Sequence, residues 1–288
     1  MNKLSGTTGI LGIFGDPVAH SLSPAMQNEA LARAGIDAVY VPFHVRPENL
    51  PQAVTALRAL EIRGVNVTIP HKESVLAHLD EIDPEARGIG AVNTIVNRNG
   101  HLVGYNTDGI GLLRSLEADL DVVPAGRRIL LLGAGGACRA ALASLIRAGA
   151  AWVGIANRTR SRASDLVDEF SEKGAGTALA AFGLDAGELS IPLGQLDLVI
   201  NTSAVGLKGE AFDEFPWDSL AAGAAIYDMV YAPETTPLLA TARSRGYRTA
   251  DGLGMLAAQG EEAFYLWTGI RPPSGVMKRR ILAECIER

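Results

Sequence analysis

The sequence predicts an α/β fold with two domains, each built around a parallel sheet. The chain has 288 residues, and at about 100–200 residues per domain this length suits two domains. Short apolar runs alternate with helical stretches along most of the chain, and strand–helix–strand alternation is typical of parallel sheets. Near the middle, a glycine-rich turn at 133–137 joins an apolar run to an alanine-rich stretch, which is typical of a doubly wound sheet.

In the first part of the chain, residues 1–111, each short apolar run ends at a turn or helix signal. Ser23 is expected to cap a helix whose first position is Pro24, and Gly35 is expected to end that helix. The expected strands are 10–15, 39–43 and 64–69, the last ended by Pro70, and the expected helices are 23–34 and 47–60.

The second part, residues 112–253, shows the same alternation. The expected strands are 127–132, 151–156, 196–200 and 225–230, and the expected helix is 137–148, ended by Gly149. The Gly/Ala-rich stretch 174–189 is expected to be a loosely ordered loop or a poor helix. The last part, 254–288, is expected to be helical, with an apolar face that includes Leu256, Phe264, Leu266 and Trp267.

Composition and charge exclude several classes of protein. Hydrophobic residues make up 48% and charged residues 20% of the chain, which excludes disorder as a global description. The formal net charge of −6 gives no basic surplus of the kind that nucleic-acid binders carry. No uncharged apolar run reaches the roughly 18 residues that a membrane span needs, and the first residues lack the apolar stretch of a signal peptide.

The two cysteines, Cys138 and Cys285, form neither a disulfide framework nor a CxxC metal pair. The histidines show no metal-ligand spacing. A reducing compartment is the simplest interpretation. We therefore expect a cytoplasmic protein with a small-molecule ligand, no metal, no membrane association and no nucleic-acid partner, acting as a monomer or a homodimer.

The glycine-rich turn fits a dinucleotide fingerprint. Gly133 allows the tight turn, Gly135 lets a pyrophosphate approach the backbone, and Cys138 is small enough for the third position, where glycine or alanine is usual. The helix that follows would offer free N–H groups and a partial positive charge to phosphate. An ordinary βα turn is the competing interpretation, and the position between a strand and a helix disfavours it.

Three arginines follow the next strand, at the point where NAD-binding domains of this kind place an acidic residue. They are Arg158, Arg160 and Arg162. A guanidinium group can hold a 2′-phosphate that a carboxylate would repel, so the sequence predicts NADP. If two arginines each contribute ~1.5 kcal/mol, NADP is preferred over NAD on the order of 10²-fold. The competing interpretation is a solvated basic helix start, which the helix dipole disfavours.

Four polar segments punctuate the first part of the chain, at 20–24, 66–72, 91–94 and 104–109. The first two follow apolar strands at the carboxyl ends, where open parallel sheets bind ligands. Their Ser, Thr and Asn side chains suit a polyhydroxylated substrate, and Lys72 suits a carboxylate or an alcohol that undergoes proton transfer. Each residue alone could equally be a cap, a turn or a surface residue, and it is their joint occurrence that favours a site.

In combination, these segments resemble shikimate dehydrogenases over nearly the whole chain. The resemblance rests on residues 21–24, 66–72, 91–94, 106–109, 133–137, 157–159, 228–231, 236–239 and 251–255. It implies the reversible reduction of 3-dehydroshikimate to shikimate by NADPH, a step of aromatic amino-acid biosynthesis. It also implies a substrate domain at 1–111, a Rossmann-type NADP domain at 112–253, and C-terminal helices at 254–288 that pack back on the first domain.

The resemblance implies roles for particular residues as well. Lys72 would be the general acid/base, and Asp108 would be its partner. Besides this pair, the residues that would hold the substrate are Ser21, Ser23, Asn66, Thr68, Asn93, Tyr231 and Gln259. The residues that would hold NADP are Gly133, Ala134, Gly135, Gly136, Ala137, Asn157, Arg158, Thr159 and Arg162, with Met229 and Gly252 lining the nicotinamide.

Two other functions stay open at this point. A quinate/shikimate dehydrogenase that uses NAD would share the fold, and Arg158 and Arg162 disfavour it. A non-catalytic NADP-binding regulator on the same fold is the second alternative, and the presence of both Lys72 and Asp108 disfavours it.

Overall fold

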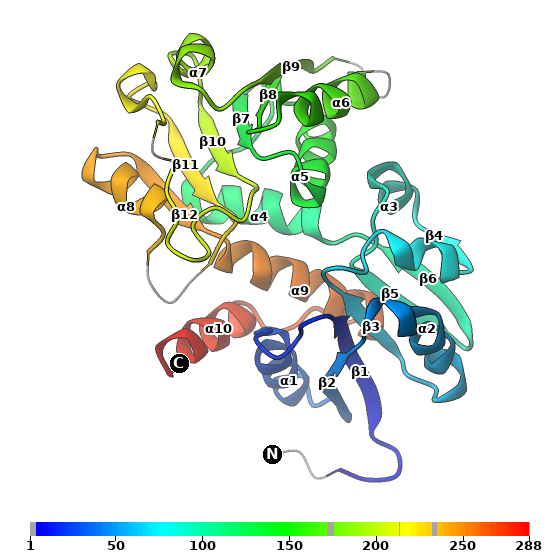
Figure 1. The fold of residues 1–288 in the computed structure, drawn as a ribbon. Helices are drawn as coiled ribbons and strands as arrows, with labels where there is room; N and C mark the ends of the chain where they lie inside the picture. Colours follow the sequence, from blue (N-terminus) through cyan, green and yellow to red (C-terminus); the bar gives the residue numbers. More distant parts are fainter. Residues whose placement is uncertain (1–3, 172–175, 213, 232–234, 288) are drawn as a thin grey trace. The chain divides into compact units, whose positions relative to one another are not determined.

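The computed structural model describes residues 4–171, 176–212, 214–231 and 235–287, and the chain divides into two compact units. Unit 1 comprises the residues up to Gly111 together with those from Ala257 onward, and unit 2 comprises Leu112–Leu256. Over the described residues, each unit holds a six-stranded sheet flanked by helices (Figure 1). The α/β fold class predicted from the sequence is confirmed. No helix within these ranges is long and apolar enough to cross a membrane.

Unit 1 combines the N-terminal strands and helices with the C-terminal end of the chain. Its strands are β1 (Gly9–Gly15), β2 (Ala38–His44), β3 (Gly64–Val67), β4 (Glu81–Ile82), β5 (Thr94–Arg98) and β6 (His101–Tyr105). Its helices are α1 (Ser23–Arg33), η1 (Pro47–Asn49), α2 (Leu50–Ala59), η2 (Ser74–His78), α3 (Pro84–Ile89), most of α9 (Leu253–Thr268) and α10 (Val276–Glu287).

The sheet of unit 1 has the strand order β2-β1-β3-β5-β6-β4. The expected parallel pairing is confirmed for β1 with both β2 and β3. In contrast, β5 runs antiparallel to β3 and to β6. The β5–β6 pairing is explained by the Asn99-Gly100 turn between these two strands, where both residues have positive φ (53° and 92°). A two-residue turn of this kind joins antiparallel strands only.

The two faces of this sheet are covered by different helices. On one face, Leu50, Val54 and Leu57 of α2 belong to a buried core with Val65 and Val67 of β3. On the other face, α9 is fixed by the Trp267 Nε1 atom, which donates to the Ile95 carbonyl at 2.9 Å, and the side chain of Gln27 in α1 donates to the Gly260 carbonyl at 3.0 Å. The C-terminal helices therefore return to unit 1, as the resemblance implied.

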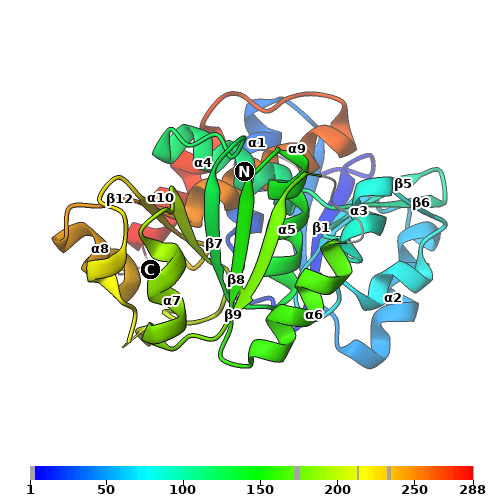
Figure 2. The ribbon, with the colours of Figure 1, turned by 90° about the horizontal axis from the view of Figure 1, so that it is seen from above.

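Unit 2 is a doubly wound sheet. Its strands are β7 (Arg128–Leu132), β8 (Trp152–Ala156), β9 (Ala178–Phe182), β10 (Leu198–Asn201), β11 (Ala225–Asp228) and β12 (Arg248–Asp251). Its helices are most of α4 (Asp108–Leu120), then α5 (Gly136–Arg147), α6 (Arg160–Ser171), α7 (Ala186–Leu193), η3 (Trp217–Ser219) and α8 (Pro237–Ser244). All strand pairs in the order β12-β11-β10-β7-β8-β9 are parallel. Apolar side chains of α4, α5 and α6 belong to one buried cluster with the sheet, and those of α7 and α8 belong to another. The ribbon shows α5 and α6 on one side of the sheet and α7 and α8 on the other (Figure 2).

The predicted cap at Ser23 is wrong. Leu22 already has helical dihedral angles, with φ −84° and ψ −9°, so the helical turn starts one residue earlier and Ser23 lies inside α1. It is the Ser21 hydroxyl that accepts a hydrogen bond from the Ser23 N–H, at 3.2 Å.

The prediction of a loose loop or poor helix at 174–189 is also wrong for the residues that the structure describes; 174 and 175 lie outside them. Residues Ala178–Phe182 form β9, which pairs one-to-one with β8, because a sheet edge supplies backbone partners whatever the local propensity. Asp185 then caps α7 by accepting from the Glu188 N–H at 2.9 Å. This Asp-x-x-Glu pattern is a variant of the capping box.

Candidate active site

Lys72 and Asp108 form an ion pair in unit 1. The Nζ atom of Lys72 donates to Oδ2 of Asp108 at 2.6 Å, and the side chains keep 32% and 16% of their surface exposed. The loop that carries Lys72 follows β3 and is tied down where Val92 N–H donates to the Lys72 carbonyl at 2.8 Å. The pair is thus held firmly at its backbone, while the ammonium group keeps access to solvent.

The second oxygen of Asp108 is fixed as well. Its Oδ1 atom accepts from Nδ2 of Asn93 at 2.8 Å, and its backbone N–H donates to Oδ1 of Asn106 at 3.0 Å as α4 begins. With both oxygens engaged, the Asp108 carboxylate has one orientation relative to Lys72. A lysine held by an oriented carboxylate is suited to donate and accept a proton at one defined position.

Three of the predicted substrate residues, Asn66, Asn93 and Gln259, belong to a hydrogen-bond network that reaches Asp108 in unit 1. Asn66 and Asn93 are buried, and Asn93 Oδ1 accepts from the Thr107 N–H at 2.8 Å. The Thr107 hydroxyl lies 3.5 Å from Oε1 of Gln259 on α9, so a residue distant in sequence joins the network. Ser21 and Ser23 lie at the start of α1, and Thr68 follows β3. Tyr231 belongs to unit 2, where it follows β11.

Sequence reasoning missed three residues of this network. The hydroxyl groups of Tyr40, Thr94 and Thr107 hydrogen-bond to Asn66 or Asn93. Thr94 and Thr107 each follow an asparagine in a polar segment, so the Asn-Thr repetition was an available signal. Tyr40 gave no signal, because a tyrosine within an apolar strand is ordinary core composition.

The glycine turn of unit 2 is shaped for an anion. Gly133 has φ +111°, and a Cβ atom there would lie 3.0 Å from Ser203 Cβ. Gly135 is the N-cap of α5 and provides no side-chain cap, and residues 135–137 are exposed. The first N–H groups of α5 therefore face solvent without a capping side chain, which is the arrangement that binds phosphate.

Cys138 occupies the small-residue position of the turn and is fully buried. Burial raises the pKa of the Cys138 thiol to about 12, against smaller lowering effects of Thr202 and Arg139. A thiol with that pKa stays neutral at physiological pH and is not an activated nucleophile. Its role is packing, as the fingerprint requires.

The arginines after β8 differ in their surroundings. Arg160 pairs with Glu188 at 3.0 Å, whereas Arg158 and Arg162 are exposed and form no ion pair with any residue that the structure describes. Asn157 shapes this loop by donating from Nδ2 to the Thr159 carbonyl at 2.8 Å. Arg158 and Arg162 are therefore the guanidinium groups available for a 2′-phosphate, and the donor set fits NADP.

The ends of β10 and β11 are joined by polar contacts. Asn201 accepts from the Ser203 N–H and hydroxyl at 2.9 and 2.7 Å and donates to Asp228 at 2.8 Å. Burial raises the pKa of the Asp228 carboxyl, against the hydrogen bonds that it accepts from Thr236, Val230 and Asn201. These contacts rigidify the loops next to the glycine turn, and the polar run 201–203 after an apolar strand was the signal that sequence reasoning passed over.

Two predicted cofactor residues, Met229 and Gly252, are brought together by this arrangement. A Cβ atom on Gly252 would collide with the Met229 carbonyl oxygen. Only glycine allows this approach, so the position of Gly252 is explained by packing against the backbone after β11.

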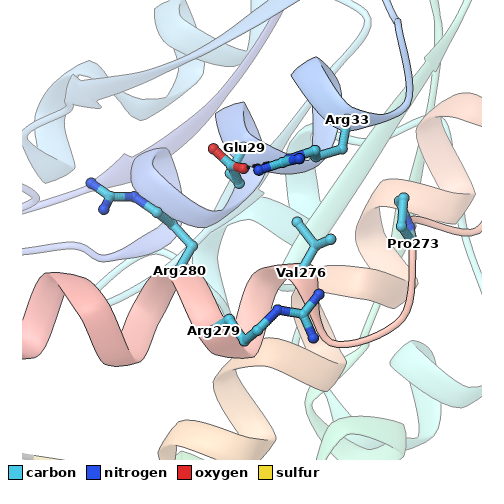
Figure 3. A pocket seen from close by; sticks show the side chains of 6 residues that line it. All are labelled: Glu29, Arg33, Pro273, Val276, Arg279 and Arg280. Carbon is cyan, nitrogen blue, oxygen red and sulfur yellow. Dashed lines mark hydrogen bonds and ion pairs between the residues drawn. The ribbon is translucent and has the colours of Figure 1, made fainter.

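A cavity of about 700 Å³ lies elsewhere in unit 1, beside α1 and α10 (Figure 3). Three arginines line it, and each has an internal partner: Arg33 pairs with Glu29 at 2.8 Å, Arg280 with Glu284 at 2.6 Å, and Arg279 donates to the Ser274 carbonyl at 3.2 Å. None of the predicted site residues lines this cavity, so it is not the candidate active site. Across the described ranges, no group of three or more His, Cys, Asp or Glu side chains is placed to hold a metal ion.

Three family models match consecutive parts of the chain. They describe the substrate-binding domain of shikimate dehydrogenase at residues 13–95, shikimate/quinate 5-dehydrogenase at 118–202, and the C-terminal domain of shikimate 5′-dehydrogenase at 252–282.

Individual relatives match over nearly the full length. The NADP(+)-dependent shikimate dehydrogenase of Geobacter metallireducens is 55% identical, over 97% of this chain and 98% of that protein. The structure of shikimate 5-dehydrogenase from Thermus thermophilus in complex with NADP(H) and shikimate has 38% identity and a TM-score of 0.84, covering 96% of this chain and 99% of that one. A 5-ketofructose reductase of Gluconobacter sp. strain CHM43 has 36% identity and a TM-score of 0.88, covering 97% and 100%.

Proposed function

The chain belongs to the shikimate dehydrogenase family, and from that premise we propose that Lys72 and Asp108 handle the proton of its reaction. The activity is the reversible, NADPH-dependent reduction of 3-dehydroshikimate to shikimate, a step of aromatic amino-acid biosynthesis. The observation that supports the roles of the pair is the 2.6 Å hydrogen bond from Lys72 Nζ to Asp108 Oδ2.

The chemistry needs a proton donor at one oxygen. NADPH supplies a hydride to the ring carbonyl carbon, so that oxygen gains negative charge. Lys72, as an ammonium group, stabilises the charge and donates a proton to the oxygen. In the reverse direction the neutral amine accepts the hydroxyl proton. Asp108 holds the amine in place through Oδ2 while Asn93 holds Oδ1.

The remaining polar residues hold the substrate. Ser21 and Ser23 bind the carboxylate, as the family resemblance implies. The ring hydroxyls are assigned to side chains that can both donate and accept hydrogen bonds, and these are Asn66, Thr68, Asn93, Tyr231 and Gln259.

The cofactor is NADP, and we assign its contacts to unit 2. The exposed N–H groups of residues 135–137 bind the pyrophosphate at the start of α5, and Gly133 and Ala134 form the turn that leads into them. Arg158 and Arg162, with Asn157 and Thr159 in the same loop, bind the 2′-phosphate side of the adenosine. Met229 and Gly252 line the nicotinamide.

Removal of the lysine tests the proposal. Lys72→Ala is expected to lower kcat by ~10²–10⁴-fold with a modest change in KM, because general acid catalysis is lost while substrate contacts stay. The control is Lys278→Ala in α10, which should keep wild-type turnover. Wild-type kcat in Lys72→Ala, measured from NADPH absorbance, would remove Lys72 from the mechanism.

Substrate and cofactor preference are tested by a matrix of NADP⁺ and NAD⁺ against shikimate and quinate. Because a 5-ketofructose reductase shares the fold, its substrate belongs in the same assay. We expect the highest kcat/KM with NADP⁺ and shikimate. Higher kcat/KM with NAD⁺ and quinate would establish the alternative dehydrogenase, and NADP binding without any turnover would establish the regulator.

We also propose that the protein acts in the cytoplasm on small molecules alone, as a monomer or a homodimer. The net charge of −6 supports the absence of a nucleic-acid partner. Light scattering on the purified protein decides between monomer and dimer, and cell fractionation tests the location.

A further inference from the structure

A chain of buried hydrogen bonds links Tyr40 on β2 to the Lys72–Asp108 pair. Tyr40 is 1% exposed, and its ring packs against Trp267 of α9 with the centroids 6.0 Å apart. Its hydroxyl donates to Oδ1 of Asn66 on β3 at 2.7 Å. The chain of contacts therefore begins at a buried side chain of unit 1.

The Tyr40 hydroxyl and the Asn93 carbonyl together determine which way the Asn66 amide faces. Because Oδ1 accepts from Tyr40, the amino group of Asn66 points the other way, toward the Asn93 carbonyl at 3.2 Å and the Thr94 hydroxyl at 3.1 Å. Asn66 is 4% exposed, so water offers little alternative to these partners. In the reversed orientation, its amide oxygen would face a carbonyl oxygen, which is unfavourable.

The orientation passes on to Asn93. The Thr94 hydroxyl accepts from Asn66 and donates its own proton to Oδ1 of Asn93 at 3.0 Å. The oxygen of Asn93 is held on this side by two donors, the Thr94 hydroxyl and the Thr107 N–H at 2.8 Å. Its amino group then faces Oδ1 of Asp108 at 2.8 Å, which leaves Oδ2 for Lys72.

The Tyr40 hydroxyl is the first donor of this series of hydrogen bonds, and it stays protonated. Burial raises the pKa of Tyr40 well above its ordinary value, against a smaller lowering effect of Ser23. The phenol therefore keeps its proton at physiological pH, and its hydroxyl remains able to donate to Asn66.

We propose that Tyr40 is a positioning residue for the reaction, whose hydroxyl, together with the Asn93 carbonyl and the Thr107 N–H, holds the Asn66 and Asn93 amides in the orientation that places Asp108 against Lys72. Tyr40 touches neither reacting group. Its effect is transmitted by side chains with two alternative orientations each, only one of which gives Asp108 a donor on Oδ1. The inference rests on the proposed roles of Lys72 and Asp108.

Tyr40→Phe isolates the hydroxyl, because the ring and its packing on Trp267 remain. We expect kcat for shikimate oxidation to fall about 10-fold, since one lost hydrogen bond of ~1.4 kcal/mol in the positioning network corresponds to that factor. The KM for NADP⁺ should stay unchanged.

The matched control is Tyr227→Phe. Tyr227 is also fully buried, and its hydroxyl forms a hydrogen bond with the hydroxyl of a buried serine, Ser115, at 2.9 Å. This control should lose a similar amount of thermal stability and keep wild-type kcat.

A double-mutant cycle separates positioning from general destabilisation. In the Asp108→Asn background the Tyr40→Phe substitution should change kcat by less than about twofold, because the group on which it acts is already altered. Wild-type kcat in Tyr40→Phe overturns the inference, and so does a full 10-fold loss that persists in the Asp108→Asn background.

If Tyr40→Phe does not fold, Thr94→Val breaks the same chain at its middle link and is judged by the same measurements. A loss of kcat that disappears in the Asp108→Asn background supports the inference, and unchanged kcat overturns it. Lys72→Ala distinguishes a failure of the proposed function from a failure of the inference about Tyr40. If that variant keeps wild-type turnover, the proposed function of the pair fails; if it loses turnover and Tyr40→Phe does not, only the inference about Tyr40 fails.

Discussion

Arg158 and Arg162 are the residues on which the choice between NADP and NAD is expected to depend. Both are exposed, and neither is neutralised by a carboxylate among the residues that the structure describes. Replacing both by alanine removes the two guanidinium groups available for a 2′-phosphate. We expect the KM for NADP⁺ to rise on the order of 10²-fold and the KM for NAD⁺ to stay unchanged, as measured by steady-state kinetics with both cofactors.

Arg160 provides the matched control for this double substitution. It lies in the same segment but is paired with Glu188 at 3.0 Å, so Arg160→Ala should leave the KM for NADP⁺ within about twofold. Equal rises in both KM values for the double variant would mean that the arginines act on the shape of the loop and not on the phosphate.

Site residues that stand in a local motif could be predicted from the sequence. Site residues that are brought together only by the pairing of strands could not. Lys72 and Asp108 stand in compact polar segments, and the joint occurrence of these segments made them recognisable. Tyr40 joins the network only because β1 lies between β2 and β3 and sets Tyr40 level with Leu11 and Asn66 level with Ile13. That register is a property of the assembled sheet, which no local pattern records.

At the scale of elements, Asp80 links the segment before β4 to α2 and β6 within unit 1. Its Oδ2 atom accepts from the Leu102 N–H of β6 at 2.7 Å and from Arg58 of α2 at 2.8 Å. These two contacts, the Leu102 hydrogen bond first, lower the pKa of the Asp80 carboxyl. Because the pKa in the folded state lies below the pKa in the unfolded state, the ionised carboxylate stabilises the fold above the unfolded pKa, and this stabilisation is lost as pH falls through the folded pKa.

Asp80→Asn should therefore lower Tm by a few degrees at neutral pH. The difference from wild type should be constant between pH 6 and pH 7 and should narrow only below the ordinary carboxyl range, near pH ~4. The control is Asp218→Asn, because Asp218 is 95% exposed in its ion pair with Arg245 and such pairs contribute little. A Tm difference that widens toward acid pH would contradict this assignment.

Regular elements with a clear apolar pattern were predictable within a few residues, and those that depend on a neighbour were not. The strands β1, β2, β7, β8 and β11 coincide with the apolar runs. In contrast, β9 is rich in alanine and exists because β8 offers it a parallel partner. The antiparallel β5 depends on the Asn99-Gly100 turn, a signal that was present in the sequence and was not used.

At the scale of the whole molecule, unit 1 is discontinuous in sequence, since α9 and α10 join strands that precede them by more than 150 residues. Hydrophobic periodicity predicted that these helices have an apolar face but contains no information about which sheet that face covers. Only the resemblance to a known family implied that these helices pack on unit 1. Gln259 entered the predicted site for the same reason.

The assignment of phosphate binding to unit 2 and substrate binding largely to unit 1 predicts where each ligand slows hydrogen exchange. At about 100 times its Kd, NADP⁺ should slow exchange up to about 10²-fold in peptides covering 133–139 and 157–162, because the exposed N–H groups at the start of α5 gain acceptors. Shikimate alone should protect peptides covering 21–24 and 66–72. Lys72→Ala should show the same NADP⁺ protection with turnover lost, since the lysine belongs to unit 1 and contributes a proton, not a phosphate contact. Absence of NADP⁺ protection at 133–139 in an active enzyme, measured by mass spectrometry, would place the cofactor away from the glycine turn.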